Sequence, residues 1–398
     1  MPLNYPQVVS KILDHLQDHK LKTFDIIFQP EEIDTSPVLC VEHNLGIESW
    51  CVKNLYLQAY DTVFKHPGPD SVHYDASVLT LLLLNPNIKT LWNKRRTFVS
   101  SGKSSVDFEL NFIKLVLSFK PKSQDALNYR KWLLKFHHLI TYQNFVQKDL
   151  PLILDAASRH TNNHVAWDYG IWYLNSVDTQ TLAKLCIMLW DETATWINTN
   201  VSDYSALHFR QFLIEKLTDK DLLPLIDYSF KKKTMLAGLE FAGSVLKVSD
   251  EDVIVEVCQK FETPDYGGFY LLGILLVDFE INEKLISFYV DHEALWNHRR
   301  FLCYHFHRVL PTALSDKSKR LFSTLVREIV NMNAEFSYIN ESNLFEFLFL
   351  KIHRGFLDKC QNVETESGRY SVKYIEWLKK CRILNLSDDG DFRNPSER

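Results

Sequence analysis

Lys122 stands where a positive charge could act on an anion. It follows Pro121 and precedes Ser123, and an amphipathic helix is expected to begin directly after it. A fixed ammonium beside the first turn of a helix can stabilise negative charge, because the helix N-terminus itself carries partial positive charge. A lysine at such a place is more commonly a solvated loop charge, so the surrounding pattern must decide between the two interpretations.

Other groups of reactive side chains lack the spacing that chemistry needs. The 7 Cys are scattered without a C-x-x-C pair, and His43 near Cys40 and Cys51 has no second spaced pair, so no metal site is predicted. The SGKS string at Ser101 is similar to the end of a phosphate-binding loop, but the leading glycine and a preceding buried strand are missing. The neighbouring residues His137 and His138 could act as bases, but no Cys or Ser lies at a spacing that would make it their nucleophile. This disfavours a stand-alone hydrolase.

Composition limits the class of protein. The 398 residues are 46% hydrophobic and include only 12 Gly and 13 Pro, which indicates long regular elements. The net charge of −5 is spread over 45 basic and 50 acidic residues, so no nucleic-acid partner is expected. Residues 1–20 have helical periodicity and lack the apolar run of a signal peptide or a membrane span. We therefore expect a cytoplasmic protein without a membrane span.

Five segments of the chain repeat one helical pattern. Each has a large apolar anchor, at Trp92, Leu127, Trp167, Leu207 and Trp296. Four of them carry Arg three residues later, and all carry a further apolar or aromatic residue five to seven positions on. We expect the anchors in the core and the guanidinium groups at its border, bonded to carbonyls or a carboxylate of the neighbouring repeat. The residues with this expected structural role are Trp92, Arg95, Arg96, Arg130, Trp132, Trp167, Trp172, Arg210, Trp296, Arg299 and Arg300.

A residue that can accept hydrogen bonds from the first helical turn precedes each repeat helix. These predicted caps are Asn87, Ser123, Asn163, Asp203 and Asp291. Amphipathic stretches between the anchors complete a helix–turn–helix unit, which can bury its apolar stripe only by stacking on its neighbours. The sequence therefore predicts an all-α fold, a right-handed superhelical crescent (α-solenoid) of stacked helical hairpins.

The repeats define the expected domain organisation. Clear copies cover about residues 85–303, and the flanking segments are expected to be degenerate caps of a single helical-repeat domain, 1–386. The polar residues 387–398 are expected to form a flexible tail.

Two segments fit the repeat pattern less well. Tyr370–Lys380 is predicted to be a sixth, decayed copy, in which Trp377 corresponds to Trp132 and Trp172. The region 217–288 shows helical patterning and a predicted turn at its paired glycines, 267 and 268, but no readable repeat.

Four strings carry a resemblance to a known family. WNKRR at Trp92, LNYRKW at Leu127, AWDYGIW at Ala166 and WNHRR at Trp296 resemble the repeats of protein prenyltransferase alpha subunits. The resemblance covers roughly residues 38–303 and implies helical hairpins wrapped around a catalytic beta subunit. It further implies that the beta subunit holds zinc and the isoprenoid, so that this chain alone binds no cofactor and is not catalytic alone.

The same resemblance gives Lys122 a role. The family has a diphosphate-contacting Lys five positions before the second anchor, and Lys122 occupies that position. The family's nearby Tyr residues are replaced by Gln124 and His164, which remain candidate diphosphate contacts because both side chains can donate hydrogen bonds. The usual His-Arg of the third repeat is Tyr169-Gly170.

Together these features predict the alpha subunit of a heterodimeric protein geranylgeranyltransferase. Its partner would be a beta subunit of the Rab geranylgeranyltransferase type, and its co-substrate geranylgeranyl diphosphate. The acceptors would be C-terminal cysteines of Rab-like small GTPases or trafficking proteins. The alternative is a non-catalytic helical-repeat scaffold that binds a protein partner and has lost the phosphate contacts.

Overall fold

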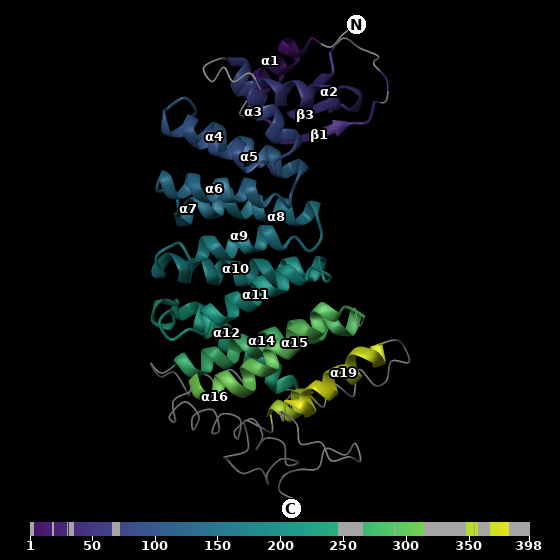
Figure 1. The fold of residues 1–398 in the computed structure, drawn as a ribbon. Helices are drawn as coiled ribbons and strands as arrows, with labels where there is room; N and C mark the ends of the chain where they lie inside the picture. Colours follow the sequence, from purple (N-terminus) through teal and green to yellow (C-terminus); the bar gives the residue numbers. More distant parts are fainter. Residues whose placement is uncertain are drawn as a thin grey trace, which may run out of the picture. The chain divides into compact units, whose positions relative to one another are not determined.

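The chain divides into two compact units, Met1–Val177 (unit 1) and Asp178–Arg398 (unit 2), which are described separately (Figure 1). The computed structural model describes residues 4–17, 20–29, 31, 36–65, 72–245, 266–289, 291–313, 348–353, 355–356 and 367–381. The predicted tail at 387–398 lies outside these residues, and the single domain 1–386 stays a prediction.

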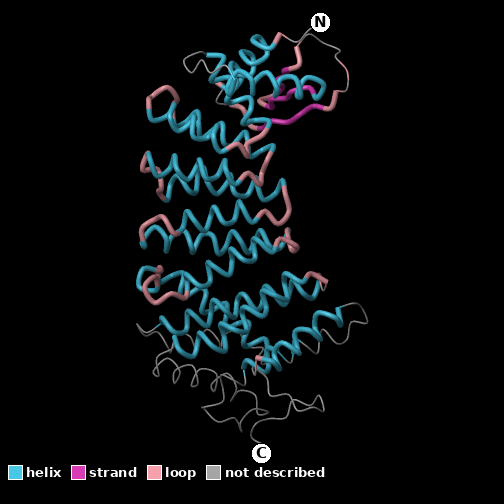
Figure 2. Tube along the Cα trace, in the orientation of Figure 1, coloured by secondary structure: helices cyan, strands magenta, loops and turns pink. Residues whose placement is uncertain are grey.

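Unit 1 consists of helices and one small sheet near its N-terminus (Figure 2). Its elements are α1 (Tyr5–Leu16), β1 (Thr23–Ile27), β2 (Val38–Val41), β3 (Asn44–Glu48), α2 (Ser49–Tyr60), η1 (Asp61–Lys65), α3 (Val72–Leu84), α4 (Lys89–Ser100), α5 (Val106–Phe119), α6 (Gln124–Phe136), α7 (Tyr142–Asn144), η2 (Phe145–Asp149), α8 (Leu150–Arg159) and α9 (His164–Leu174). From α4 onward the helices pack as successive hairpins, with α5 against α6 and α8 against α9.

The sheet of unit 1 is the feature that the sequence did not predict. Its strand order is β1-β3-β2, with β3 parallel to β1 and antiparallel to β2. A two-residue turn joins β2 to β3, and both of its residues have positive φ, 47° at Glu42 and 72° at His43. Such a turn normally contains Asn or Gly. Here its two residues are Glu and His, so the sequence gives no signal for the hairpin. Asn44 stabilises the turn by donating its side-chain amide to the Val41 carbonyl at 3.2 Å.

The described residues of unit 2 form helices joined by turns and loops. Its elements are α10 (Thr179–Thr199), α11 (Tyr204–Leu217), η3 (Leu223–Leu225), α12 (Tyr228–Val245), α14 (Tyr266–Phe288), α15 (Glu293–Tyr304), η4 (His305–Val309), α16 (Leu310–Ala313) and α19 (Ser367–Lys380). The all-α prediction is thereby confirmed for the repeat region of both units. The turn predicted at residues 267 and 268 is wrong, because both lie inside α14.

Two facing glycines explain part of the region 217–288, which gave no readable repeat. A Cβ atom at Gly238 of α12 would lie 2.8 Å from the Cα of Gly273 in α14, so only glycine allows the two helices to approach this closely. Close packing here replaces the large apolar anchors of the repeats. No helix among the described residues is both long and apolar enough to span a bilayer.

The predicted caps divide into two groups. Ser123, Asn163 and Asp203 accept hydrogen bonds from amide groups of the first turn, as predicted. Asn87 and Asp291 do not, because α4 and α15 begin one residue later and have Ile88 and His292 at the cap position. The predictions for these two residues are wrong because the cap lies four residues before the anchor, whereas both residues lie five before it.

Two turns of π-helix have a common sequence cause. η2 and η4 are each followed directly by Leu-Pro, at Pro151 and Pro311. A proline inside a helix lacks an amide donor and its ring pushes on the carbonyl four residues earlier, which favours a local widening of the helix. The first of these turns ends on Asp149, a buried acid of the site described below.

Candidate functional site

The repeat arginine of unit 1's first clear hairpin lies in a buried charge cluster. The Arg95 side chain is fully buried, and its Nε donates to Glu109 Oε1 of α5 at 3.1 Å. Tyr129, two residues after the next anchor, donates its hydroxyl to Glu109 Oε2 at 3.0 Å. Asp75 and Ser104 also accept from this guanidinium. Arg95 thus joins its own helix to α3 and to α5 of the next hairpin, and α6 bonds to the same α5 carboxylate.

The following repeat has the same arrangement. Arg130 Nε donates to Asp149 Oδ1 at 2.7 Å, and Tyr169 donates its hydroxyl to the same carboxylate oxygen. Tyr169 again lies two residues after an anchor, Trp167. Burial raises the pKa of Tyr169 well above its ordinary value, so the hydroxyl keeps its proton and acts as a donor.

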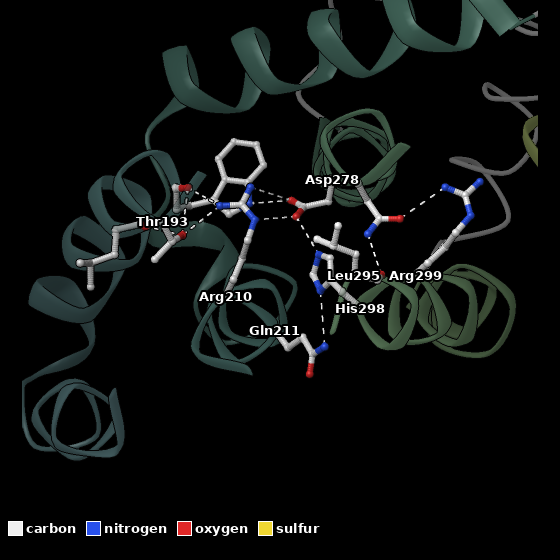
Figure 3. A network of polar contacts seen from close by, with 10 residues as sticks. Thr193, Arg210, Gln211, Asp278, Leu295, His298 and Arg299 are labelled. Atoms are coloured by element: carbon white, nitrogen blue, oxygen red, sulfur yellow. Dashed lines mark hydrogen bonds and ion pairs between the residues drawn. The ribbon is translucent and has the colours of Figure 1, made fainter. Parts of the chain in front are cut away.

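In unit 2 the corresponding network is centred on Asp278 (Figure 3). Arg210 binds this carboxylate with two nitrogens, Nε to Oδ1 at 2.6 Å and Nη2 to Oδ2 at 3.1 Å. Trp190 donates to Oδ2 at 2.8 Å, and His298 Nε2 lies 3.3 Å from Oδ1. Burial alone would raise the pKa of Asp278, but Arg210 and His298 together outweigh it and hold that pKa below its usual range.

The arginine of the fifth repeat has a weaker arrangement. Arg299 is fully buried, with Nη1 3.5 Å from Asn282 Oδ1 and Nη2 3.9 Å from Glu283 Oε2. Its guanidinium also lies 3.5 Å from the ring centroid of Phe356. The third repeat has Gly170 at the arginine position, and the fourth repeat has Phe209 where Tyr129 and Tyr169 donate. In the first, second and fourth repeats, an arginine and the donor of the following repeat bind the same carboxylate. Between the third and fourth repeats, both the arginine and that donor are missing.

These clusters give the repeat-motif residues a structural role. The anchors Trp92, Trp167 and Trp296 are buried, and so are the four repeat arginines. Arg96 and Arg300, the second arginines of the two W-N-x-R-R strings, each donate to an asparagine three residues earlier in the same helix, both at 3.0 Å. A buried, paired guanidinium is inaccessible to a substrate and fixes the neighbouring repeats relative to each other.

The candidate diphosphate contacts lie together at one edge of unit 1. Lys122 is exposed in the turn before α6, and Gln124 and His164 are the exposed first residues of α6 and α9. The two turns are tied together by Asn163, whose side-chain amide donates to the Pro121 carbonyl at 2.9 Å. Consecutive helix N-termini therefore present their partial positive charge at the same edge as the Lys122 ammonium.

The three candidates differ in how free they are to bind. Gln124 donates its amide to Asn128 Oδ1 at 3.4 Å on its own helix. Lys122 and His164 are exposed, and Lys120 adds a second exposed ammonium in the same turn. The exposed ammonium groups and the helix N-termini give this edge the means to hold an anion.

The cysteines and histidines among the described residues provide no metal site. Within the described residues, no group of three or more His, Cys, Asp or Glu side chains could hold a metal ion. His43 lies in the β2–β3 turn, while Cys51 is buried in α2 and donates to the Glu48 carbonyl at 3.2 Å. Burial raises the pKa of the Cys51 thiol to about 11, so it is protonated at neutral pH.

Sequence reasoning missed the acids and donors that complete the clusters. The missed residues are Glu109, Tyr129, Asp149, Tyr169, Asp278 and His298. A signal for three of them was present, because each of Tyr129, Tyr169 and His298 lies two residues after an anchor.

The fold and these repeated clusters define an all-α protein of stacked helical-hairpin repeats. A family model described as the protein prenyltransferase alpha subunit repeat matches residues 106–137, 190–217 and 277–306. These ranges fall on α5 and α6, on α10 and α11, and on α14, α15 and the start of η4. The chain belongs to this repeat family.

Curated relatives agree with this assignment. Protein prenyltransferase alpha subunit repeat-containing protein 1 from Homo sapiens is 29% identical over 379 residues, 86% of this chain and 88% of that protein. Repeat-containing protein 1-B from Xenopus laevis is 30% identical over 297 residues, 69% and 66% of the two chains. The geranylgeranyl transferase type-2 subunit alpha of Saccharomyces cerevisiae is 29% identical over 145 residues, 35% and 44% of the two chains.

Proposed function

We propose that this chain is the alpha subunit of a heterodimeric protein geranylgeranyltransferase that acts in the cytoplasm. Its partner is a beta subunit of the Rab geranylgeranyltransferase type, which holds zinc and the isoprenoid. The acceptors are C-terminal cysteines of Rab-like small GTPases or trafficking proteins. The similarity to a geranylgeranyl transferase type-2 alpha subunit supports this choice of lipid and partner.

The observation that carries the proposal is the edge at which Lys122 and His164 stand exposed beside two helix N-termini. When a cysteine sulfur displaces diphosphate from the isoprenoid, negative charge grows on the leaving oxygen. A fixed ammonium stabilises that charge as it develops, which lowers the barrier more than it strengthens binding of the substrate. Lys122 would supply the ammonium, and His164 and Gln124 would donate hydrogen bonds to phosphate oxygens.

The test is co-expression with candidate beta subunits, followed by purification and transfer of labelled geranylgeranyl diphosphate to Rab-like acceptors. The proposal predicts a stable one-to-one complex that labels the acceptors, and no transfer by the isolated chain. Labelled farnesyl diphosphate is the matched control for the lipid. A failure to form a complex with any beta subunit would contradict the proposal.

The second candidate is a non-catalytic scaffold that binds a protein partner. Gln124 and His164 replace the family's tyrosines, and Gly170 removes one repeat arginine, which favours a chain that kept the fold and lost the phosphate contacts. A complex that forms without any transfer would support this candidate.

A further inference from the structure

One face of unit 1 carries cations and aromatic rings that the hairpin packing leaves open. On α4, α6 and α9, the positions one, four, five and eight after each anchor lie on one helical face. All of them are exposed or half-buried: Asn93, Arg96, Thr97, Ser100, Asn128, Lys131, Trp132, Lys135, Asp168, Ile171, Trp172 and Asn175. We call these residues the cation–aromatic face.

The cations of this face lie over the indoles of the next helix. The Arg96 guanidinium is 5.6 Å from the ring centroid of Trp132, and the Lys131 ammonium is 5.3 Å from that of Trp172. Lys135 lies 5.5 Å from the same Trp172 ring. The contacts run from α4 to α6 and from α6 to α9, so they form a continuous row rather than isolated pairs.

The two tryptophans of the row are not core residues. Trp92 and Trp167 are each only 2% exposed, whereas Trp132 and Trp172 are half-buried. Phe136, one residue beyond Lys135, is 49% exposed and extends the aromatic surface along α6. Aromatic rings and arginine left at a surface in this way are enriched where one protein binds another.

The three cations form no close ion pair in the part of the chain that the structure describes, although the charge of Asp168 acts on Lys131. None of Arg96, Lys131 and Lys135 forms an ion pair there, and Asp168 is the one acid on the face. The face thus has a net positive charge, with three cations and one acid beside apolar rings. A ligand that fits it carries carboxylates at short spacing together with an apolar side chain.

The repeat fold does not require this charge. The same positions on α11 and α15 of unit 2 are His208, Gln211, Phe212, Glu215, Asn297, Arg300, Phe301 and Tyr304. They keep aromatic rings but carry one arginine and one glutamate, so their charges cancel with histidine neutral. Among the compared repeat helices of the described residues, those of unit 1 carry the positive face.

We propose that the cation–aromatic face binds an acidic segment of a partner protein. Carboxylates of the segment pair with Arg96, Lys131 and Lys135, and an apolar side chain packs on the Trp132 and Trp172 rings. The whole chain has a net charge of −5 and no long-range field for a polyanion, which favours a short acidic peptide over nucleic acid. The inference goes beyond the proposed function, because it holds for a transferase subunit and for a scaffold alike.

The test measures binding of a short fluorescent peptide of repeated Glu-Glu-Leu to the full chain by anisotropy. The same peptide with Gln or Lys in place of Glu, a single-stranded RNA, and vesicles containing phosphatidylserine are the comparison probes. We expect the Glu peptide alone to bind, with an affinity that falls as salt is added.

Charge reversal makes the test specific to the face. The double variant Lys131→Glu, Lys135→Glu is expected to lose at least about tenfold in affinity for the Glu peptide and to gain binding of the Lys peptide. The control double variant Lys53→Glu, Lys114→Glu changes two exposed lysines of unit 1 that lie off the face, and should keep the affinity. Equal losses in both variants, or binding of RNA or vesicles through Lys131 and Lys135, would overturn the proposal.

Discussion

Units 1 and 2 pair their buried arginines in chemically different ways. In unit 1 the carboxylates of Glu109 and Asp149 each accept from a tyrosine hydroxyl. In unit 2 Asp278 accepts from the Trp190 indole and faces His298. In all three cases the residue two positions after an anchor contacts the carboxylate that binds the arginine. The type of that residue differs between the two units.

The two units also differ in the charge of their repeat faces. The repeat face of unit 1 is rich in cations, and tyrosine hydroxyls donate to the carboxylates in the core beneath it. The same face of unit 2 is aromatic and its charges cancel. Unit 2 instead places histidines inside, at His298, His305 and His353. The comparison shows that unit 1 gathers its charges on the repeat face, whereas unit 2 buries titratable rings in its interior.

The largest expected effect comes from Asp278→Ala. It leaves the buried Arg210 guanidinium without its carboxylate, and an unpaired buried charge costs about 3–5 kcal/mol of stability. Hydrogen–deuterium exchange should show strong loss of protection in α11 and α14. Asp191→Ala, an exposed aspartate of α10, is the matched control and should leave exchange unchanged. Similar exchange in the two variants would show that Asp278 does not hold the unit 2 network together.

A smaller effect is expected from Tyr169→Phe in unit 1. The variant keeps the ring but removes the hydroxyl from the Arg130–Asp149 pair, and a hydrogen bond to a charged group contributes about 1.5–3 kcal/mol. Urea unfolding measures the loss. Tyr142→Phe, which removes the hydroxyl of an exposed tyrosine, is the control. A loss of equal size at Tyr142 would contradict a special role for the position two after the anchor.

The smallest effect is a pH dependence of unit 2. Burial lowers the pKa of His305 to about 4, and burial together with Arg308 lowers that of His307 to about 4. The unfolded chain binds these protons near pH 6.5, so stability is full above that pH and falls as pH drops towards 4. We expect a loss on the order of 1 kcal/mol per histidine.

This pH dependence can be assigned to its residues. The double variant His305→Phe, His307→Phe should flatten the decline of unit 2 stability between pH 6.5 and 4, measured by exchange in α15. The matched variant His160→Phe, at an exposed histidine of unit 1, should leave the decline in place. An unchanged decline in the double variant would place the titrating groups elsewhere.

The anchors and the repeat helices could be predicted because local spacing determines them. Trp92 and Arg95 share a helix, and a three-residue step puts them on adjacent parts of one face. The acids could not be predicted in the same way, because Glu109, Asp149 and Asp278 lie 14, 19 and 68 residues after their arginines. Such spacings follow from loop lengths and from the π-helical turn before Pro151, which no periodicity reveals.

At the edge with Lys122, too, local features could be predicted and long-range contacts could not. The order of turn, lysine and cap follows from neighbouring residues and can be predicted from sequence. The hydrogen bond that joins the turns of two repeats cannot. Asn163 was predicted as a cap, but its second role, donation to the Pro121 carbonyl, depends on stacking of α6 beside α9. Long-range contacts of this kind decide whether Lys122 and His164 face one ligand.

The most direct measurement is the rate of geranylgeranyl transfer by the reconstituted complex that contains Lys122→Ala. The account predicts a rate lowered by roughly tenfold or more with unchanged complex formation, because the leaving diphosphate loses a fixed positive charge. Lys114→Ala, at an exposed lysine of α5, should transfer at the rate of the unchanged complex. Full transfer by the Lys122→Ala complex would contradict the assignment of this edge to the diphosphate.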